Sequence, residues 1–193
     1  MGPHRVLSLF INELSEGLHR SGVHEIVPLT RSRVEWSGIC SELSILSPFC
    51  TFIHFLINGP NSNYVDKKYL PVIYAHTPAG TGLHIFTQLL QIVDAERFQA
   101  FDYGSPSRNH KEYGQTTPPP YLLSRVTAPV GMFWSDNDWV VDAKDIALTA
   151  SQLPNVVLNY RVPTHDFNHA DFMWAETAGE QVYKPVIKFL KSL

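Results

Sequence analysis

The sequence predicts an α/β protein in which a mostly helical first part leads into a second part of alternating strands and helices. Residues 1–120 combine short apolar helical patterns with polar turns, whereas residues 121–193 follow the order strand, loop, helix, strand, loop, helix. The continuous apolar run Pro129–Trp134 has the length of a buried parallel strand, and Val156–Val162 is a second strand pattern. Since a helical pattern separates the two, we expect a right-handed parallel crossover.

Apolar spacing predicts the helices of the first part. One helix is expected over Leu7–Gly22 and another over Thr81–Val93, the latter with Leu83, Phe86, Leu89, Leu90 and Val93 on one face. One or two shorter helices are expected over Ser37–Asn58, with a break near Ser47 and Pro48. The segment Thr116–Pro120 ends in three prolines, which fix φ and exclude helix, so it should be an extended connector.

The second part carries clear helix signals as well. A helix is expected from about Asp142 to Leu153 with Asp142 as its N-cap, because an aspartate side chain can accept hydrogen bonds from the first free N–H groups. A last helix should run from about Thr177 to Leu190, and Pro185 should kink it.

Composition narrows the class of protein. The chain is 44% hydrophobic and 17% charged with a net charge of −3, which is typical of a globular protein and excludes a strongly basic nucleic-acid binder. The apolar run near the N-terminus is too short for a convincing signal peptide, and Phe49–Leu56 is too short for a transmembrane helix. Cys40 and Cys50 are ten residues apart, a spacing that leaves both a disulfide and two buried thiols open.

Two residues could carry chemistry together. Asp138 follows the first predicted strand and His169 follows the second, and residues just past the carboxyl ends of parallel strands face the crevice where ligands bind. A carboxylate beside an imidazole fixes its tautomer and stabilises the imidazolium that forms when the ring takes a proton. The alternatives are an Asp-rich solvated turn for Asp138 and, for His169, either a surface residue or half of a weak metal pair with His165. No third metal ligand has a recognisable spacing, so no metal cofactor is expected.

Several blocks in order resemble the acid lipase family, which includes gastric and lysosomal lipases and insect relatives. The blocks are Tyr74–Thr81, Phe98–Pro106, Pro119–Tyr121, Asn137–Trp139 and Asn168–Phe172. The resemblance covers essentially the whole chain and is collinear, which makes it specific although each block alone is weak.

The resemblance implies a partial α/β-hydrolase fold. Residues 1–120 would be cap and lid, and residues 121–193 the C-terminal part of the hydrolase core with its last two parallel strands. Asp138 would be the triad acid and His169 the triad base of an enzyme acting on triacylglycerols or cholesteryl esters, secreted or lysosomal and without a cofactor. The resemblance also favours a lid disulfide between Cys40 and Cys50.

The sequence departs from the family pattern in one decisive respect. It contains no G-x-S-x-G, the motif that presents the serine nucleophile of these hydrolases, and no N-x-[ST] glycosylation sequon. We therefore expect a partial chain, the C-terminal half of such an enzyme, that does not hydrolyse esters alone.

Two other interpretations stay open. The chain could be a non-catalytic protein that binds lipid or a partner and derives from the lipase cap. It could also be an unrelated hydrolase with Ser105 or Ser135 as nucleophile, although neither serine lies on the strained turn that activates such a hydroxyl.

Overall fold

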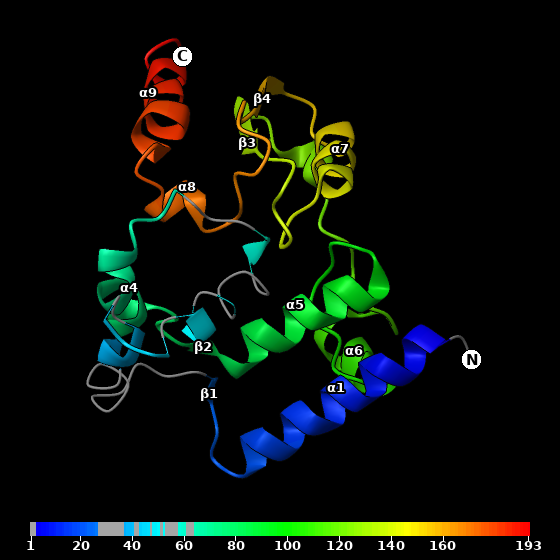
Figure 1. Ribbon diagram of the computed structural model, residues 1–193. Helices are drawn as coiled ribbons and strands as arrows, with labels where there is room; N and C mark the ends of the chain where they lie inside the picture. The colour runs from blue at the N-terminus through cyan, green and yellow to red at the C-terminus, as the bar shows by residue number, and fades with distance from the viewer. Residues whose placement is uncertain are drawn as a thin grey trace. The chain divides into compact units, whose positions relative to one another are not determined.

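The computed structural model of the protein describes residues 3–26, 37–40, 43–46, 48–50, 52, 58–60 and 64–193, with the side chains of 3–10 left out. It divides into two compact units (Figure 1). The first unit combines Met1–Arg31 with His76–Tyr121, and the second combines Ser32–Ala75 with Leu122–Leu193. After Tyr121 the chain stays in the second unit, which also contains residues 32–75. The predicted division into cap and lid (1–120) and core (121–193) stays a prediction.

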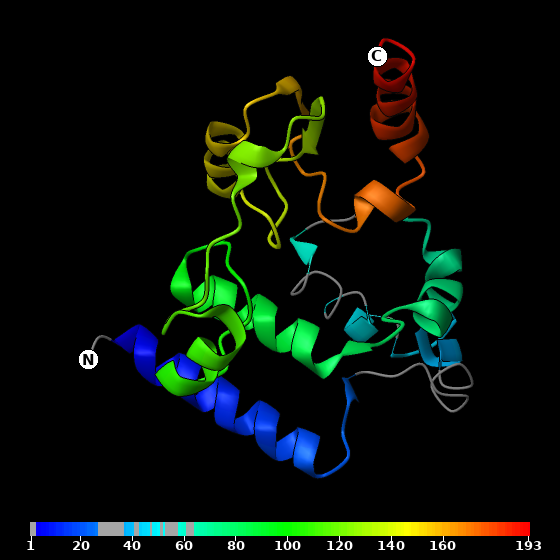
Figure 2. The ribbon, with the colours of Figure 1, turned by 180° about the vertical axis from the view of Figure 1, so that it is seen from behind.

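Two helices dominate the first unit. Helix α1 (Pro3–Arg20) lies along α5 (Leu83–Ala95), and both views of the ribbon show them side by side (Figure 2). Strand β1 (Glu25–Ile26), which follows α1, pairs antiparallel with β2 (Thr81–Gly82), which directly precedes α5. The two helices predicted from apolar spacing are therefore confirmed.

The buried face of α5 differs from the predicted one. The structure buries Leu83, Thr87, Gln91 and Asp94 and leaves Leu89 55% and Val93 74% exposed. Thr87 Oγ1 hydrogen-bonds Ser15 Oγ of α1 at 2.8 Å. Gln91 makes two 2.8 Å hydrogen bonds to the backbone of Asp102, one from Nε2 to the carbonyl and one to Oε1 from the N–H. Satisfied polar side chains can be buried between helices, so apolar spacing alone indicated the wrong face.

The rest of the first unit is held by caps and backbone pairing. Helix α6 (Pro106–Tyr113) has Ser105 as N-cap, whose side chain accepts from the N–H of Arg108, and ends at Gly114 with φ of 72°. The extended connector predicted over Thr116–Pro120 is found only in its last part. Thr116 and Thr117 lie in a bend, whereas the Pro119 carbonyl accepts from Ala100 N at 3.0 Å and Tyr121 N donates to Phe98 O at 3.0 Å.

The second unit contains the predicted parallel strands. Strand β3 (Val130–Trp134) pairs in parallel with β4 (Val156–Arg161), and α7 (Ala143–Gln152) lies between them in sequence. Asp142 caps α7 as predicted, because its carboxylate accepts from Lys144 N at 2.8 Å and Asp145 N at 2.9 Å. The protein is thus a mixed α/β protein with a parallel strand pair.

The C-terminal helical region changes from π-helix to α-helix just before Pro185, and the kink predicted at this proline stays a prediction. A π-helical segment, η4 (Gly179–Tyr183), leads into α9 (Lys184–Leu190), which has Pro185 in its first turn. A Cβ at Gly131 would stand 2.6 Å from Cε1 of Phe189, so the ring of α9 packs directly on the backbone of β3. Before η4 lies the short helix α8 (Asp171–Trp174).

Two small apolar clusters hold the second unit together. The larger contains Val162, Phe167, Ala175, Ala178 and Val182. The other contains Val65, which precedes η2 (Lys67–Tyr69), together with Leu70 and Ile73 of α4 (Leu70–His76). Phe167 is fully buried and stands two residues before His169, so the core directly supports the segment that carries this histidine.

A disulfide joins Cys40 at the end of η1 (Ser37–Cys40) to Cys50, with the two Cα atoms 5.7 Å apart. This bond decides between the two states that spacing left open. The carbonyl of Cys50 accepts a 2.8 Å hydrogen bond from the Tyr74 hydroxyl of α4. Of the helices predicted over Ser37–Asn58, much lies outside the described residues.

Within the part of the chain that the structure describes, no helix is both long enough and apolar enough to cross a bilayer.

Candidate active site

The candidate site lies entirely in the second unit, in the two loops that follow the parallel strands. Asp138 comes four residues after the end of β3, and His169 comes eight residues after the end of β4. Because parallel strands end at the same edge of a sheet, both loops start from one edge. The structure brings the two predicted residues into contact: His169 Nδ1 lies 2.9 Å from Asp138 Oδ2.

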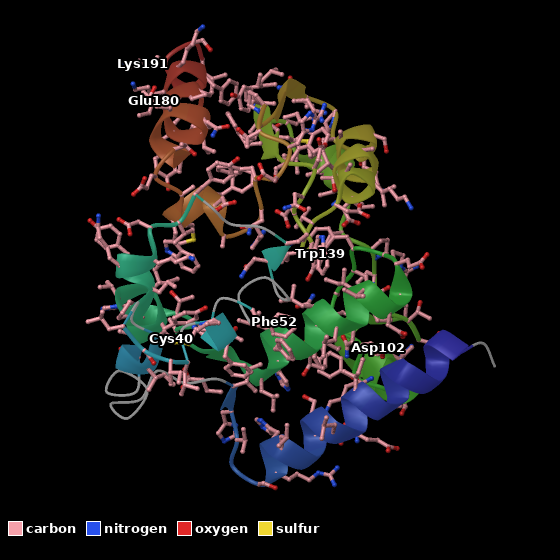
Figure 3. The ribbon with its side chains drawn as sticks, viewed as in Figure 1. Cys40, Phe52, Asp102, Trp139, Glu180 and Lys191 are labelled. Carbon is pink, nitrogen blue, oxygen red and sulfur yellow. A yellow bond between two sulfur atoms is a disulfide. The ribbon has the colours of Figure 1, made fainter. Side chains whose placement is uncertain are left out.

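Asp138 is a buried carboxylate whose two oxygens have separate partners: the backbone for Oδ1 and His169 for Oδ2. Its side chain is 8% exposed, and its Oδ1 accepts from the backbone N–H groups of Val140 at 2.8 Å and Val141 at 2.9 Å. Figure 3 labels Trp139, which lies in the same loop and is 60% exposed. The two backbone hydrogen bonds to Oδ1 orient Oδ2 toward His169, while the neighbouring Trp139 side chain is exposed on the loop surface.

Hydrogen bonding and burial shift the pKa of each member of the pair in opposite directions. Burial raises the pKa of the Asp138 carboxyl, but hydrogen bonds from His169 and from the two backbone N–H groups outweigh it, so that pKa is below its usual value. The hydrogen bond to Asp138 raises the pKa of the His169 imidazole, and partial burial opposes this. Since an ionised carboxylate can only accept, Nδ1 of His169 carries the hydrogen and Nε2 of the neutral ring is the basic atom.

The imidazole of His169 is only half-buried, with 44% of the side chain exposed. Among the described residues, no hydrogen bond to its Nε2 is found. The ring is thus held from the Nδ1 side, and a basic nitrogen with no partner among the described residues can accept a proton from another group and return it.

Asn168 and Asp171 fix the backbone on both sides of His169. Both are fully buried. Asp171 Oδ2 accepts from Asn168 N at 2.8 Å, and Asn168 Oδ1 accepts from Ala170 N at 3.0 Å and Asp171 N at 3.1 Å. Asn168 was not predicted as part of the site, because Asn next to His carries no signal that distinguishes support from an ordinary loop.

A distant segment, Asn58–Pro60, also reaches the site. The carbonyl of Asn58 accepts from His169 N at 3.1 Å, and the carbonyl of Gly59 accepts from Asn168 Nδ2 at 3.3 Å. Here the sequence indicates only a turn, since Asn, Gly and Pro are common turn residues.

The other candidates named from sequence have different surroundings. Ser105 belongs to the first unit and its hydroxyl caps α6. Ser135 is 1% exposed, and its hydroxyl has no hydrogen-bond partner within the described ranges. His165 is 81% exposed and lies 3.2 Å from Asp136. No group of three or more His, Cys, Asp or Glu among the described residues is arranged to hold a metal ion.

Fold and site together define an α/β protein with a hydrogen-bonded Asp–His pair beyond the carboxyl ends of two parallel strands. Known proteins similar to this chain are lipases. It is 34% identical to lipase lipl-1 of Caenorhabditis elegans over 158 residues, which are 80% of this chain and 38% of that protein. It is 34% identical to the gastric triacylglycerol lipase of Bos taurus over 152 residues, 79% of this chain and 38% of that lipase.

A lysosomal acid lipase/cholesteryl ester hydrolase from Rattus norvegicus is 31% identical over 160 residues, 82% of this chain and 40% of the relative. The chain is therefore a homologue of the acid lipases of the gastric and lysosomal type, as the sequence blocks predicted. It spans about two fifths of the length of these relatives. No protein-family model matches the chain.

Proposed function

We propose that Asp138 and His169 are the acid and base of the catalytic triad of a lipase-type carboxylic ester hydrolase. The observation that carries this proposal is the 2.9 Å hydrogen bond between His169 Nδ1 and Asp138 Oδ2 in a chain homologous to lipases. By this homology the substrates would be triacylglycerols or sterol esters, and the enzyme would be secreted or lysosomal.

In the proposed mechanism, His169 is a general base and then a general acid. Its Nε2 removes the proton from a serine hydroxyl as the oxygen attacks the ester carbonyl, and later returns that proton to the leaving alcohol. Asp138 keeps the ring in the tautomer with hydrogen on Nδ1 and stabilises the imidazolium between these steps. Neither step requires a metal.

The serine of the proposed triad lies outside these 193 residues, because they contain no G-x-S-x-G. Residues 1–120 would contribute cap and lid, and residues 121–193 the last part of an α/β-hydrolase core. Without the serine hydroxyl, the pair has no nucleophile to deprotonate, and without the oxyanion donors the negative charge that develops on the ester oxygen is not stabilised. A polypeptide of these 193 residues alone should therefore neither hydrolyse esters nor react at serine.

The test compares two polypeptides. The 193-residue chain should release no fatty acid from a triacylglycerol emulsion and should not be labelled by a fluorophosphonate serine probe. The longest polypeptide that the gene encodes with these residues in frame should do both, and should lose hydrolysis in His169→Ala. Labelling of the 193-residue chain itself would favour a different nucleophile, with Ser135 the first to substitute.

A second candidate function is lipid or partner binding without catalysis. It is favoured by the exposed apolar side chains of α5, where Ile85, Leu89 and Val93 are 60%, 55% and 74% exposed. Such surfaces commonly bind another molecule. Purification of the 193-residue chain followed by extraction and mass spectrometry decides: retained fatty acid or acylglycerol at stoichiometric amounts supports this function, and a lipid-free monomer contradicts lipid binding.

A further inference from the structure

Three consecutive carbonyls of the segment Asn58–Pro60 each accept a hydrogen bond from the site. The carbonyl of Asn58 binds the backbone N–H of His169, and the carbonyl of Gly59 binds the side-chain amide of Asn168. The carbonyl of Pro60 accepts from the side-chain amide of Asn137, which also donates to Asp166 O at 3.1 Å. The segment thus joins the loop that follows β3 to the loop that follows β4.

The central residue of this segment has room for glycine alone. Gly59 is buried and has a φ of 114°, which L side chains rarely adopt. A Cβ at this position would stand 2.2 Å from the carbonyl oxygen of Asn137 and 3.3 Å from Cβ of Asn168. The backbone of Gly59 therefore lies close to both loops at once, and no side chain fits between it and the Asn137 carbonyl.

The two residues that Gly59 touches are the immediate neighbours of the proposed triad pair. Asn137 precedes Asp138, and Asn168 precedes His169. A carbon atom added at residue 59 would force the Asn137 carbonyl to retreat by about 1 Å, since non-bonded atoms repel steeply below about 3 Å. Because the Asn137 carbonyl belongs to the peptide that joins it to Asp138, the carboxylate would move with it.

We infer that Asn58–Pro60 is a positioning element, in which the bare backbone of Gly59 and three carbonyls set the distance between Asp138 and His169. This role rests on the proposed function of the pair and adds a third segment to it, 78 residues before Asp138. Gly59 touches no substrate; it acts through Asn137 and Asn168. The positioning role explains how a half-exposed imidazole keeps a 2.9 Å contact with a buried carboxylate across two loops.

The experiment is an NMR titration of the His169 imidazole in the intact 193-residue chain with isotope-labelled histidine. Four proteins are compared: the wild type, Asp138→Asn, Gly59→Ala and Gly114→Ala. Gly114 is the matched control, because it also has a positive φ, 72°, but a Cβ added there would meet nothing within 4 Å. Asp138→Asn removes the hydrogen-bonded carboxylate, with its charge, that raises the pKa of His169, so it defines the titration of a ring without this partner.

Gly59→Ala should shift the titration of His169 toward that of Asp138→Asn and weaken the Nδ1–H resonance, whereas Gly114→Ala should titrate as the wild type does. A wild-type titration in Gly59→Ala overturns the inference. If Asp138→Asn itself leaves the titration unchanged, the pairing fails, and with it the proposed function rather than the positioning role alone.

Should Gly59→Ala not fold, Asn137→Ala provides the same test without adding an atom to the backbone contact. It deletes the amide that binds the Pro60 carbonyl, and Asn137 is only partly buried. The expected shift of His169 has the same direction as in Gly59→Ala, and a wild-type titration in a folded Asn137→Ala protein overturns the inference.

Discussion

Both units bury polar side chains, but the two regions differ in what those side chains leave available. Between α1 and α5, Thr87 and Gln91 are neutral and direct their hydrogen bonds at other buried groups or backbone. In the loops of the second unit, a buried carboxylate, Asp138, is bonded to a half-exposed imidazole, His169.

Buried polar residues that support the fold differ from those that can do chemistry in whether a proton-exchanging group stays available. A neutral network whose members hydrogen-bond one another and the backbone fixes the register of two helices and contains no group that can exchange a proton. A titratable pair with one atom facing outward can exchange a proton with a third group. Four predictions test this distinction, beginning with the largest expected effect.

Removing either member of the pair should abolish most activity in the longest polypeptide that carries these residues and hydrolyses esters. Asp138→Asn or His169→Ala should lower kcat/KM by ~10³-fold or more, because each change disables proton transfer. The measurement is fatty acid release from a triacylglycerol emulsion. Asp136→Asn is the matched control from the same loop. Its exposed carboxylate pairs with Arg161, so activity should stay within about threefold. Near-normal activity in Asp138→Asn would remove the distinction between the two regions.

Opening the neutral network should cost stability instead of activity. Gln91→Leu leaves the backbone N–H and carbonyl of Asp102 unsatisfied, so the free energy of unfolding should fall by about 1–3 kcal/mol in urea titration. Gln115→Leu is the control, since Gln115 is exposed and should change stability by less than about 0.5 kcal/mol. Equal effects in both variants would mean that the buried hydrogen bonds of Gln91 do not stabilise the helix pair.

The pair should also give a pH-dependent stability term with a defined sign. The raised pKa of His169 contributes stability below the unfolded value of about 6.5, and this is lost as pH rises through the folded value. The lowered pKa of Asp138 contributes above about 3.9, and this is lost as pH falls through the folded value. The pair therefore stabilises the fold most between roughly pH 4 and 6.5.

Urea unfolding of the wild type and His169→Gln at about pH 5.5 and pH 8.5 measures this term. The advantage of the wild type should be under about 1 kcal/mol at the lower pH, because His169 is half-exposed, and should shrink at the higher pH. An advantage that grows with pH would contradict the assigned direction of the His169 pKa.

The smallest effect is expected on the outer face of α5. Val93→Ser replaces a side chain that is 74% exposed, so the free energy of unfolding should change by less than about 0.5 kcal/mol. Leu83 lies on the buried face and is 4% exposed, so Leu83→Ala should lower the free energy of unfolding by about 2 kcal/mol or more in the same urea titration. A large loss in Val93→Ser would show that the apolar face of α5 is the packed one.

Features with local signals were predictable from sequence. The apolar run of β3 and the N-cap at Asp142 follow from neighbouring residues. The pairing of Asp138 with His169 followed from one further rule, that both come after parallel strands.

Features that depend on distant contacts were not predictable. Gln91 is buried because it meets the backbone of Asp102, and Gly59 is required because Asn137 lies against it. Neither partner can be identified from the residues near Gln91 or Gly59 in sequence. Apolar spacing therefore favoured the exposed face of α5, and no local pattern marked Asn58–Pro60 as part of the site.

The bond between Cys40 and Cys50 has a practical consequence for anyone who produces this protein. In a bacterial cytoplasm, glutathione and thioredoxin would keep both sulfur atoms reduced. The hydrogen bond from the Tyr74 hydroxyl to the Cys50 carbonyl would then involve a cysteine that is no longer linked to Cys40. The host should secrete the chain or export it to the periplasm, and a thiol assay under denaturing conditions should accompany every preparation before any titration or enzyme measurement is interpreted.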